Sequence, residues 1–377
     1  MTLLRDPSYH AIVYSPDANG GPGAPKLELD RDILNLVWQQ TMNLPGLAAF
    51  SLGRYNSKLA SIAWMQDHIK IVREDARATK TVFAGKLVKP DFGTSDVIVR
   101  CWDYFAFLQR SRTGFRTLYP SKKIGTEIVS PEWTAAKAVS NSPFAFVADG
   151  TIEDPLGADD VTPIKTNADF GVVDFNRLFV FYTLAEMAMA NTDHNVVVEI
   201  TREAPHTFNL WKDRSAQRTA YHFAFPGNLV GLSYQPGYDQ YRNDLATVIS
   251  DGAGSDSEYV VTASDVATTA YRRLQDAVAL QTLLGATGAT EADQGKSALE
   301  RLLKEGTRIP ALVGLQPRQG ELTPFDGWDL GDTFRVTVQK ADRSGDEHDG
   351  YLRAISVGAA WLPGAGELVQ LYARGVP

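Results

Sequence analysis

The chain has 377 residues, of which 44% are hydrophobic and 22% charged, proportions that are typical of a globular protein and exclude a disordered tail or linker. Its formal net charge of -8 argues against a nucleic-acid-binding role that depends on neutralising phosphates. The single cysteine, Cys101, excludes an internal disulfide framework and a multi-cysteine metal site, so stability must come from packing and association.

The start of the sequence has no apolar run followed by a small-residue cleavage site, and no window approaches the roughly 18 apolar residues of a membrane helix. We therefore expect synthesis in a cytoplasm and no membrane segment. The length exceeds what one hydrophobic core usually organises, which predicts two to four packed units.

The N-terminal third is predicted to be β. Residues 1–24 carry three prolines and the turn Asn19-Gly20-Gly21, which indicates an irregular arm with one strand at 10–14. Five β-branched segments separated by turn residues follow, and they predict a meander that closes into a small barrel: 33–38, 48–52, 69–73, 81–88 and 96–101. Ile69, Ile71, Val97 and Val99 should face one side of it, and Lys70, Val72, Ile98 and Arg100 the other.

The middle of the chain mixes helices and strands. A helical turn is predicted at 104–110, a capped helix from Ser130-Pro131 to 140, a buried helix at 174–191 and a strand at 195–201. Residues 219–234 predict a strand pair broken at Pro226-Gly227-Asn228. A strand at 244–250 is followed by a helix from Ser264-Asp265 to about 284, which Gly285 and Gly288 end, and by a second helix at 290–305.

The last part returns to β, with strands predicted at 311–315, 332–339, 351–361 and 367–373. The predicted fold class is α+β, mainly β, with two small β-barrel domains at the N- and C-terminal ends flanking mixed α/β domains. The predicted domains are an N-terminal β-barrel at 1–115, an α+β domain at 116–218, a second α+β domain with two helices at 219–310, and a C-terminal β-barrel at 311–377.

No catalytic, cofactor-binding or metal site is predicted. The six histidines, at 10, 68, 194, 206, 222 and 348, lack the spacing that places two ligands on one helical face. There is no Gly-x-Ser-x-Gly elbow, and Cys101 lies in a predicted strand, where a buried inert thiol is expected. The glycines at 285 and 288 follow a helix, so they do not form a phosphate-binding loop.

Two patterns keep other functions open. The acidic loop formed by Asp149, Glu153, Asp154, Asp159 and Asp160 could supply a carboxylate pair for glycoside hydrolysis, although a solvated loop is the simpler interpretation. The aromatic residues of Trp102-Asp103-Tyr104-Phe105 and of Tyr234, Tyr238 and Tyr241 could stack carbohydrate, although packing in cores and between subunits is the simpler interpretation.

Three parts of the chain resemble phage tail hub proteins. The segments 36–38, 45–52, 82–85 and 96–103 are similar to the opening barrel of those proteins. Residues 223–229 and 242–248 resemble the middle of actinobacteriophage-type minor tail proteins, and the segments 330–336, 350–357 and 366–371 look like the closing barrel.

The resemblance implies a non-enzymatic tail-tip hub in the virion, a homotrimer whose two barrels per chain match a six-fold tail tube. It implies that the hub binds a distal tail ring protein or the tail tube above it, and tip, fibre or receptor-binding proteins below it. It also implies contact with the tape measure protein and a lumen through which DNA passes without specific binding. Many relatives carry an appended peptidase or glycan-cleaving module, which is not expected here. The alternatives are a hexameric distal tail ring protein, a glycan-binding protein that uses the tyrosine cluster, and a glycan hydrolase that uses Glu153 and Asp154.

Overall fold

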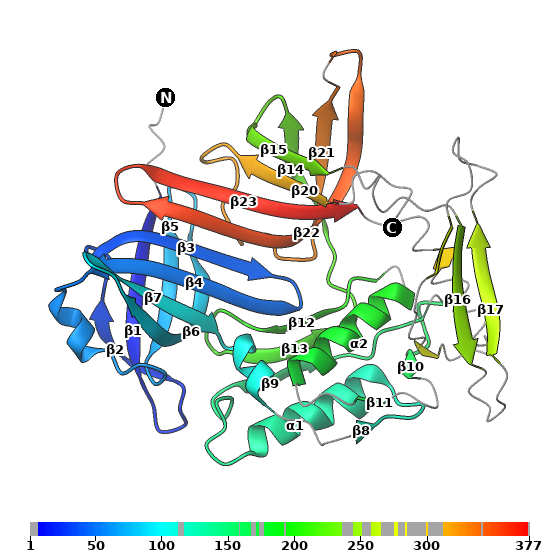
Figure 1. The fold of residues 1–377 in the computed structure, drawn as a ribbon, viewed down its shortest axis with the longest axis horizontal. Helices are drawn as coiled ribbons and strands as arrows, with labels where there is room; N and C mark the ends of the chain where they lie inside the picture. The colour runs from blue at the N-terminus through cyan, green and yellow to red at the C-terminus, as the bar shows by residue number, and fades with distance from the viewer. Residues whose placement is uncertain are drawn as a thin grey trace.

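A computed structural model shows a large curved sheet with a smaller layer of helices and strands below it (Figure 1). The structure describes all residues except 1–6, 112–116, 158, 167–170, 173–176, 192–193, 236–243, 251–257, 265–274, 278–282, 285–298, 301–311, 341 and 376–377. The chain is mainly β, as the sequence predicts, and the strands of its two ends lie side by side.

The large sheet has 13 strands. The N-terminal part contributes β1 (Ser8–Pro16), β2 (Pro22–Glu28), β3 (Ile33–Thr41), β4 (Leu44–Gly53), β5 (His68–Glu74), β6 (Thr79–Phe92) and β7 (Asp96–Asp103). The C-terminal part contributes β14 (Gln217–Phe225), β15 (Leu229–Gln235), β20 (Leu312–Pro317), β21 (Thr333–Gln339), β22 (Asp346–Leu362) and β23 (Gly366–Gly375). The main path runs β15-β20-β23-β22-β3-β4-β7-β6-β5-β1-β2, and β21 and β14 extend it from β22.

Alternating side chains build the interior of this sheet. Ile69, Ile71, Val97 and Val99 are fully buried on one face, as predicted, whereas Ile98 and Arg100 on the other face are exposed. Most inward residues are aliphatic or aromatic, so most strands contribute an apolar row to a common core.

The two-barrel layout is not confirmed, and no closed barrel is found among the described strands. The reason lies in β22, which pairs with β21 through its first half and with β3 through its second half. The edge of β3 that could close an N-terminal barrel is therefore occupied by a C-terminal strand. The sheet nevertheless curls, since the rings of Tyr9 on β1 and Trp361 on β22 lie 5.4 Å apart although their strands are distant in the sheet order.

The layer below contains a three-stranded sheet and two helices. The sheet consists of β12 (Val197–Ile200), β13 (Thr207–Trp211) and β9 (Ala148–Ile152), with β13 antiparallel to β12 and parallel to β9. The helices are α1 (Ser130–Ala138), preceded by the π-helical turn η3 (Gly125–Val129), and α2 (Arg177–Asn191), and both confirm predicted helices. Phe208 holds the layer together, because it stacks on Trp133 of α1 at 4.2 Å and contacts Phe181 of α2 at 5.5 Å.

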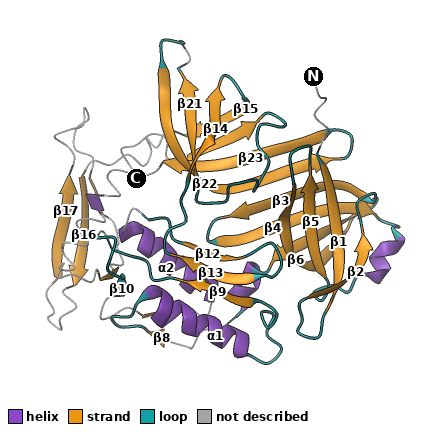
Figure 2. Ribbon diagram, turned by 180° about the vertical axis from the view of Figure 1, so that it is seen from behind, coloured by secondary structure: helices purple, strands orange, loops and turns teal. Residues whose placement is uncertain are grey.

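Smaller elements complete the described chain (Figure 2). In one short sheet, β16 (Asp244–Ser250) lies between β17 (Glu258–Ser264) and β18 (Gln275–Ala277). Two others pair β10 (Lys165–Thr166) with β19 (Leu283–Leu284), and β8 (Thr117–Leu118) with β11 (Gly171–Val172). The 3-10 helices are η1 (Ser57–Ser61) and η2 (Phe105–Arg110), and η2 is the predicted helical turn after the first strands. None of the helices described has the length and apolar content needed to span a membrane.

Three predictions of local structure were wrong. The strand predicted at 10–14 is confirmed as part of β1, but the arm around it is not irregular, because β1 pairs with β5 over seven residues and β2 follows at Pro22–Glu28. The strands on either side of Pro226 do not pair with each other, since β14 pairs with β21 and β15 with β20. Residues 275–277 and 283–284 are strands rather than helix, because the edges of β16 and β10 provide partners for them. Of the second predicted helix, residues 299–300 are helical and the rest lies outside the described residues, as do Gly285 and Gly288.

Candidate assembly surface

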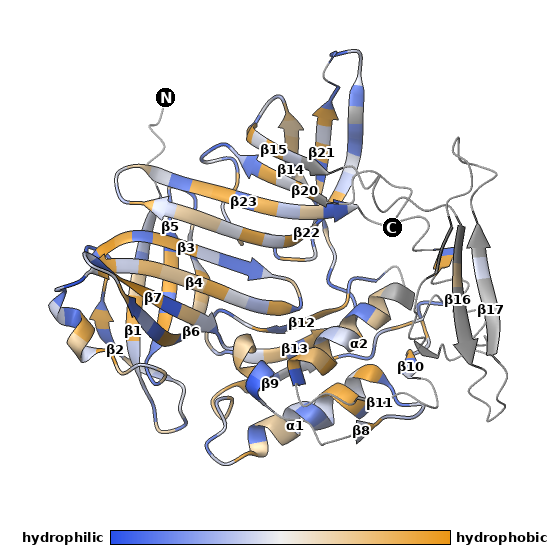
Figure 3. Ribbon diagram, viewed as in Figure 1, coloured by the Kyte–Doolittle hydropathy of each residue, from blue (hydrophilic) through white to orange (hydrophobic). Residues whose placement is uncertain are grey.

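An apolar strip lies on the outward side of the large sheet. We call it the outer face and define it by Val37 on β3, Leu47 on β4, Ile98 on β7, Leu362 on β22 and Leu368 on β23, whose exposed fractions range from 38% to 53%. Apolar stretches run along these strands in Figure 3. Exposed apolar surface that extends over five neighbouring strands is typical of a protein contact rather than of free surface.

The strand register places these residues on one face. Val37 pairs with Ala49 and Ala360, and Ala360 in turn pairs with Leu368. Residues directly opposite in a sheet point to the same side, and residues two apart along a strand share it. Leu362, Leu47 and Ile98 therefore lie on the side of Val37, opposite the buried Leu36 and Trp38.

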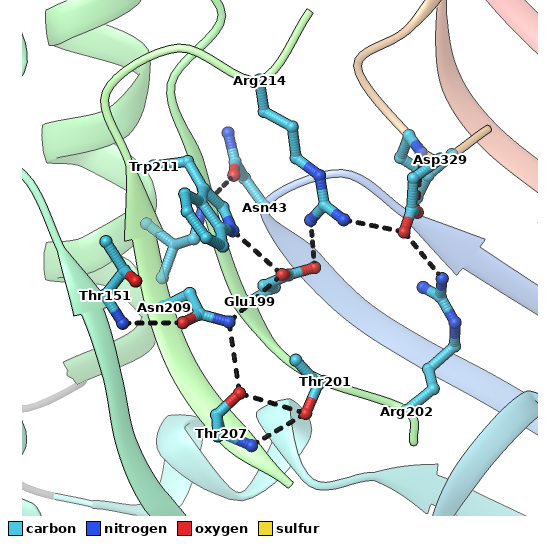
Figure 4. Close-up of polar contacts among 12 residues, drawn as sticks. Asn43, Thr151, Glu199, Thr201, Arg202, Thr207, Asn209, Trp211, Arg214 and Asp329 are labelled. Carbon is cyan, nitrogen blue, oxygen red and sulfur yellow. Dashed lines mark hydrogen bonds and ion pairs between the residues drawn. The ribbon is translucent and has the colours of Figure 1, made fainter. Parts of the chain in front are cut away.

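A polar junction joins the lower layer to the large sheet (Figure 4). Glu199 of β12 pairs with Arg214, and Arg214 Nη2 donates to Asp329 Oδ2 at 2.8 Å. Arg202 Nη2 donates to the same oxygen at 2.9 Å. Trp211 Nε1 donates to Glu199 Oε1 at 3.0 Å, so the carboxylate is held from both sides. Because Asp329 belongs to the loop before β21, the junction fixes the lower layer to the C-terminal strands.

The electrostatics of the junction indicate structure rather than reactivity. Burial acts to raise the pKa of Asp329, but the charges of Arg202 and Arg214 lower it overall, so the carboxylate stays ionised. The cavity beside it, lined by Asn43, Asp103 and these groups, measures about 40 Å³. This volume has room for a few water molecules and none for a substrate.

Each carboxylate of the acidic loop has its own hydrogen-bonding partner. Asp149 accepts hydrogen bonds from Trp133 and Lys137, Glu153 from the backbone of Lys212, and Asp154 from the backbone of Thr126. Asp159 accepts from Thr162, and Asp160 pairs with His194. The hydrogen bond from Lys137 lowers the pKa of Asp149, and that from Thr162 lowers the pKa of Asp159 to about 2. A general acid needs the opposite shift.

The histidines and the cysteine also take structural positions. Within the part of the chain that the structure describes, no group of three His, Cys, Asp or Glu side chains can hold a metal ion. Cys101 is buried, and burial raises the pKa of its thiol, which keeps it protonated and unreactive. Tyr238 and Tyr241 lie outside the described residues, so the predicted stacking platform with Tyr234 stays a prediction.

Tyr104 and Phe105, from the other aromatic run, lie at the boundary between the two layers. Tyr104 contacts Phe146 at 5.0 Å and His206 at 4.7 Å between ring centroids, and Phe105 is buried. Asp103 accepts hydrogen bonds from the backbone of Gly46 and Ala106, although burial raises the pKa of its carboxyl to about 7. This run therefore packs the interior, as its simpler interpretation states, except for Trp102, which stays half-buried on the outer side.

His68 and His10 should titrate on opposite sides of the ordinary histidine range. Burial and, to a smaller extent, the charge of Lys86 lower the pKa of His68 to about 4, although the hydrogen bond between its Nε2 and the Gly20 carbonyl at 3.0 Å acts to raise it. A hydrogen bond to Asp30 raises the pKa of His10. The stability that neutral His68 contributes is thus complete above pH 6.5 and is lost as the pH falls from 6.5 through about 4. Histidine-selective NMR titration measures both midpoints, and a His68 midpoint near 6.5 would contradict this assignment.

Sequence reasoning missed the residues that join distant segments. Arg73 and Glu367 form a buried ion pair with a 2.7 Å contact, although they are 294 positions apart. The polar junction brings Arg202 and Arg214 to Asp329 across more than a hundred residues. No local sequence pattern predicts which distant residue pairs with which. A charged residue at an inward-facing strand position, such as Arg73 two residues after Ile71 in β5, does indicate that a buried partner of opposite charge exists.

The fold has counterparts among solved structures. No protein-family model and no curated protein sequence matches the chain. A tail protein from Neisseria meningitidis is similar with a TM-score of 0.61 at 12% identity, covering 98% of this chain and 97% of that one. A 43 kDa prophage tail protein from Shewanella oneidensis gives 0.58 at 12% identity, covering 97% and 98%. A prophage tail protein from Listeria monocytogenes gives 0.54 at 13% identity, covering 97% and 94%.

The similarity extends over nearly the whole length of each protein, so it includes the strands of both ends and the layer between them. It confirms, at the level of the fold, the resemblance that the sequence carries in its opening, middle and closing segments. This chain has the fold of phage tail proteins.

Proposed function

We propose that the chain is a non-enzymatic structural subunit of a phage tail tip, a hub that closes the distal end of the tail tube as a homotrimer. The observation that carries the proposal is the outer face, five neighbouring strands with exposed apolar side chains on a fold shared with tail proteins. In a closed ring, each copy covers such a face of the next one. The interaction surface is then the functional site, and the polar junction keeps the lower layer rigid against the sheet.

In this proposal, the strands of the N-terminal and C-terminal parts act as two similar β units, so that three copies present six units to a six-fold tube. The domain boundaries at residues 115, 218 and 310 belong to the same proposal. The hub binds a distal tail ring protein or the tube above, tip, fibre or receptor-binding proteins below, and the tape measure protein. DNA passes its lumen without specific binding.

Light scattering of the purified protein tests the trimer. We expect three times the 41.3 kDa mass of one chain at micromolar concentration. Changing Val37 and Leu368 together to aspartate should shift the mass to that of one chain, because burying two carboxylates in an apolar contact is unfavourable. Circular dichroism checks that the variant remains folded.

Val161→Asp is the matched control, because Val161 is 77% exposed in a loop away from the outer face. It should leave the mass unchanged. A stable wild-type monomer would overturn the proposed hub, and a hexamer would favour the distal tail ring protein.

A further inference from the structure

Two cations and two aromatic rings form a cluster beside the outer face. We call it the cationic corner: Lys86 on β6, Trp102 on β7, and Phe107 and Arg110 on η2. The Arg110 guanidinium lies 4.6 Å from the Trp102 ring centroid, the Lys86 ammonium lies 5.8 Å from that of Phe107, and the two rings are 6.1 Å apart. The aromatic pair therefore supports both cations.

The strand register connects the corner to the outer face. Lys86 pairs with Trp102, and Trp102 pairs with Leu47, whose side chain is 53% exposed. Since directly opposed residues share a side of the sheet, the cations border the apolar strip at its β6 edge. A partner that lies on Leu47 and Trp102 would thus meet both charges.

The cations of the corner have no acidic partner among the described residues. Lys86 and Arg110 take part in no ion pair or side-chain hydrogen bond there, whereas other half-buried lysines do, for example Lys26 with Asp67 at 2.7 Å. Burial lowers the pKa of the Lys86 ammonium group. The neighbouring sequence also provides few acidic partners, because residues 104–126 contain five Lys or Arg and no Asp or Glu.

We propose that the cationic corner, together with Leu47, binds an acidic segment of a partner protein, with its carboxylates on Lys86 and Arg110 and an apolar side chain on Leu47 and Trp102. A guanidinium stacked on a ring keeps its N–H edge free for a carboxylate, and a desolvated ammonium group gains from any anion that reaches it. The exposed leucine favours protein over nucleic acid, since a phosphate backbone buries no aliphatic surface. The proposal does not depend on the trimer.

Fluorescence anisotropy of a labelled peptide that contains Glu-Leu-Glu-Leu-Glu tests the corner in the intact protein. We expect saturable binding that weakens with added salt and falls by about tenfold or more in the double variant Lys86→Gln and Arg110→Gln. The matched control removes the same charge elsewhere, with Lys340→Gln and Arg343→Gln in the exposed turn between β21 and β22, and should bind as the wild type does.

Several results would overturn the proposal. The first is that the peptide does not bind, and the second is that both double variants lose peptide affinity equally. The third is that a peptide with glutamine in place of glutamate binds equally well. The fourth is that a single-stranded DNA oligonucleotide binds through Lys86 and Arg110 when the peptide does not. A change of oligomeric mass in the Lys86 and Arg110 variant, without any wild-type peptide binding, would assign the corner to a second copy of the chain instead. Light scattering reads the oligomer and anisotropy reads the peptide, so failures of the two proposals are distinguishable.

Discussion

Replacing Glu367 with glutamine is expected to lower the free energy of unfolding by about 3 kcal/mol, because it removes one of the two carboxylates that neutralise a buried arginine. Arg73 and Glu367 are each only 2% exposed at the side chain. Arg73 Nε lies 2.9 Å and 3.0 Å from the two carboxylate oxygens, and its Nη2 lies 2.7 Å from Oε2. The pair joins β5 to β23, so its loss weakens the contact between the two ends of the chain.

Neighbouring groups make the pair difficult to replace by one change. The Tyr9 hydroxyl donates to Glu367 and accepts from Trp38 Nε1 at 3.0 Å, and Asp75 binds Arg73 from the other side. Burial acts to lower the pKa of Arg73, but the hydrogen bonds and charge of Glu367 raise it overall, so the guanidinium stays charged. Arg73→Met combined with Glu367→Leu removes both charges of this pair but leaves the Asp75 carboxylate without its arginine, so it should also destabilise the protein.

Urea unfolding at pH 7 measures these differences. The matched control is Asp349→Asn, which breaks the exposed Arg335–Asp349 pair and should leave the midpoint almost unchanged. If Glu367→Gln unfolds at the same urea concentration as Asp349→Asn, the buried pair does not have the role assigned to it here.

Asn43→Ala is expected to cost about 2–4 kcal/mol, because the Asn43 side chain satisfies the open edge of β12. Its Nδ2 donates to the Val196 carbonyl at 3.1 Å, and its Oδ1 accepts from the Val198 amide at 2.8 Å. The residue lies in the turn between β3 and β4, is 2% exposed, and has a φ of 59°. One amide group thus replaces a strand partner and joins the large sheet to the lower layer.

Asn43→Gly separates the two contributions to this cost. Glycine loses the same hydrogen bonds but adopts a positive φ without strain, so it should be less damaging than alanine. Hydrogen exchange of the Val198 amide provides the local measurement, and both variants should accelerate it. Unchanged protection of Val198 would mean that another group satisfies this edge.

Local patterns predicted the elements whose formation depends on their own residues. The alternation around Ile69, Ile71, Val97 and Val99 gave the strands β5 and β7 with the correct inward side. The proline and the acid after Ser130 gave α1, although Ser130 itself makes no capping hydrogen bond and α1 continues directly from η3. The nearly uniform apolar character of 174–191 gave the buried helix α2. Each of these signals operates over a few residues, within which periodicity and helix-start residues favour one conformation.

For the acidic loop and for Trp102, the sequence identified candidate residues but not their arrangement in space. Composition identified both as unusual, but it could not say whether the carboxylates converge or which side of the sheet the indole occupies. The structure distributes Asp149, Asp154 and Asp160 among separate partners, and it places Trp102 beside Lys86 and Leu47 on the outer side.

By itself, the sequence determined that the chain is mainly β at both ends and mixed between them, because hydrophobic periodicity and turn residues act locally. Only the tertiary structure decided which strands pair. Strand β22 pairs with the free edge of β3. Strands β14 and β15 pair with different strands despite the turn between them, and residues 275–277 form a strand beside β16. The physical reason is that the backbone N–H and C=O groups of a strand edge need hydrogen-bonding partners, which any strand brought close by folding can supply. The local sequence of a strand does not indicate which distant strand this will be.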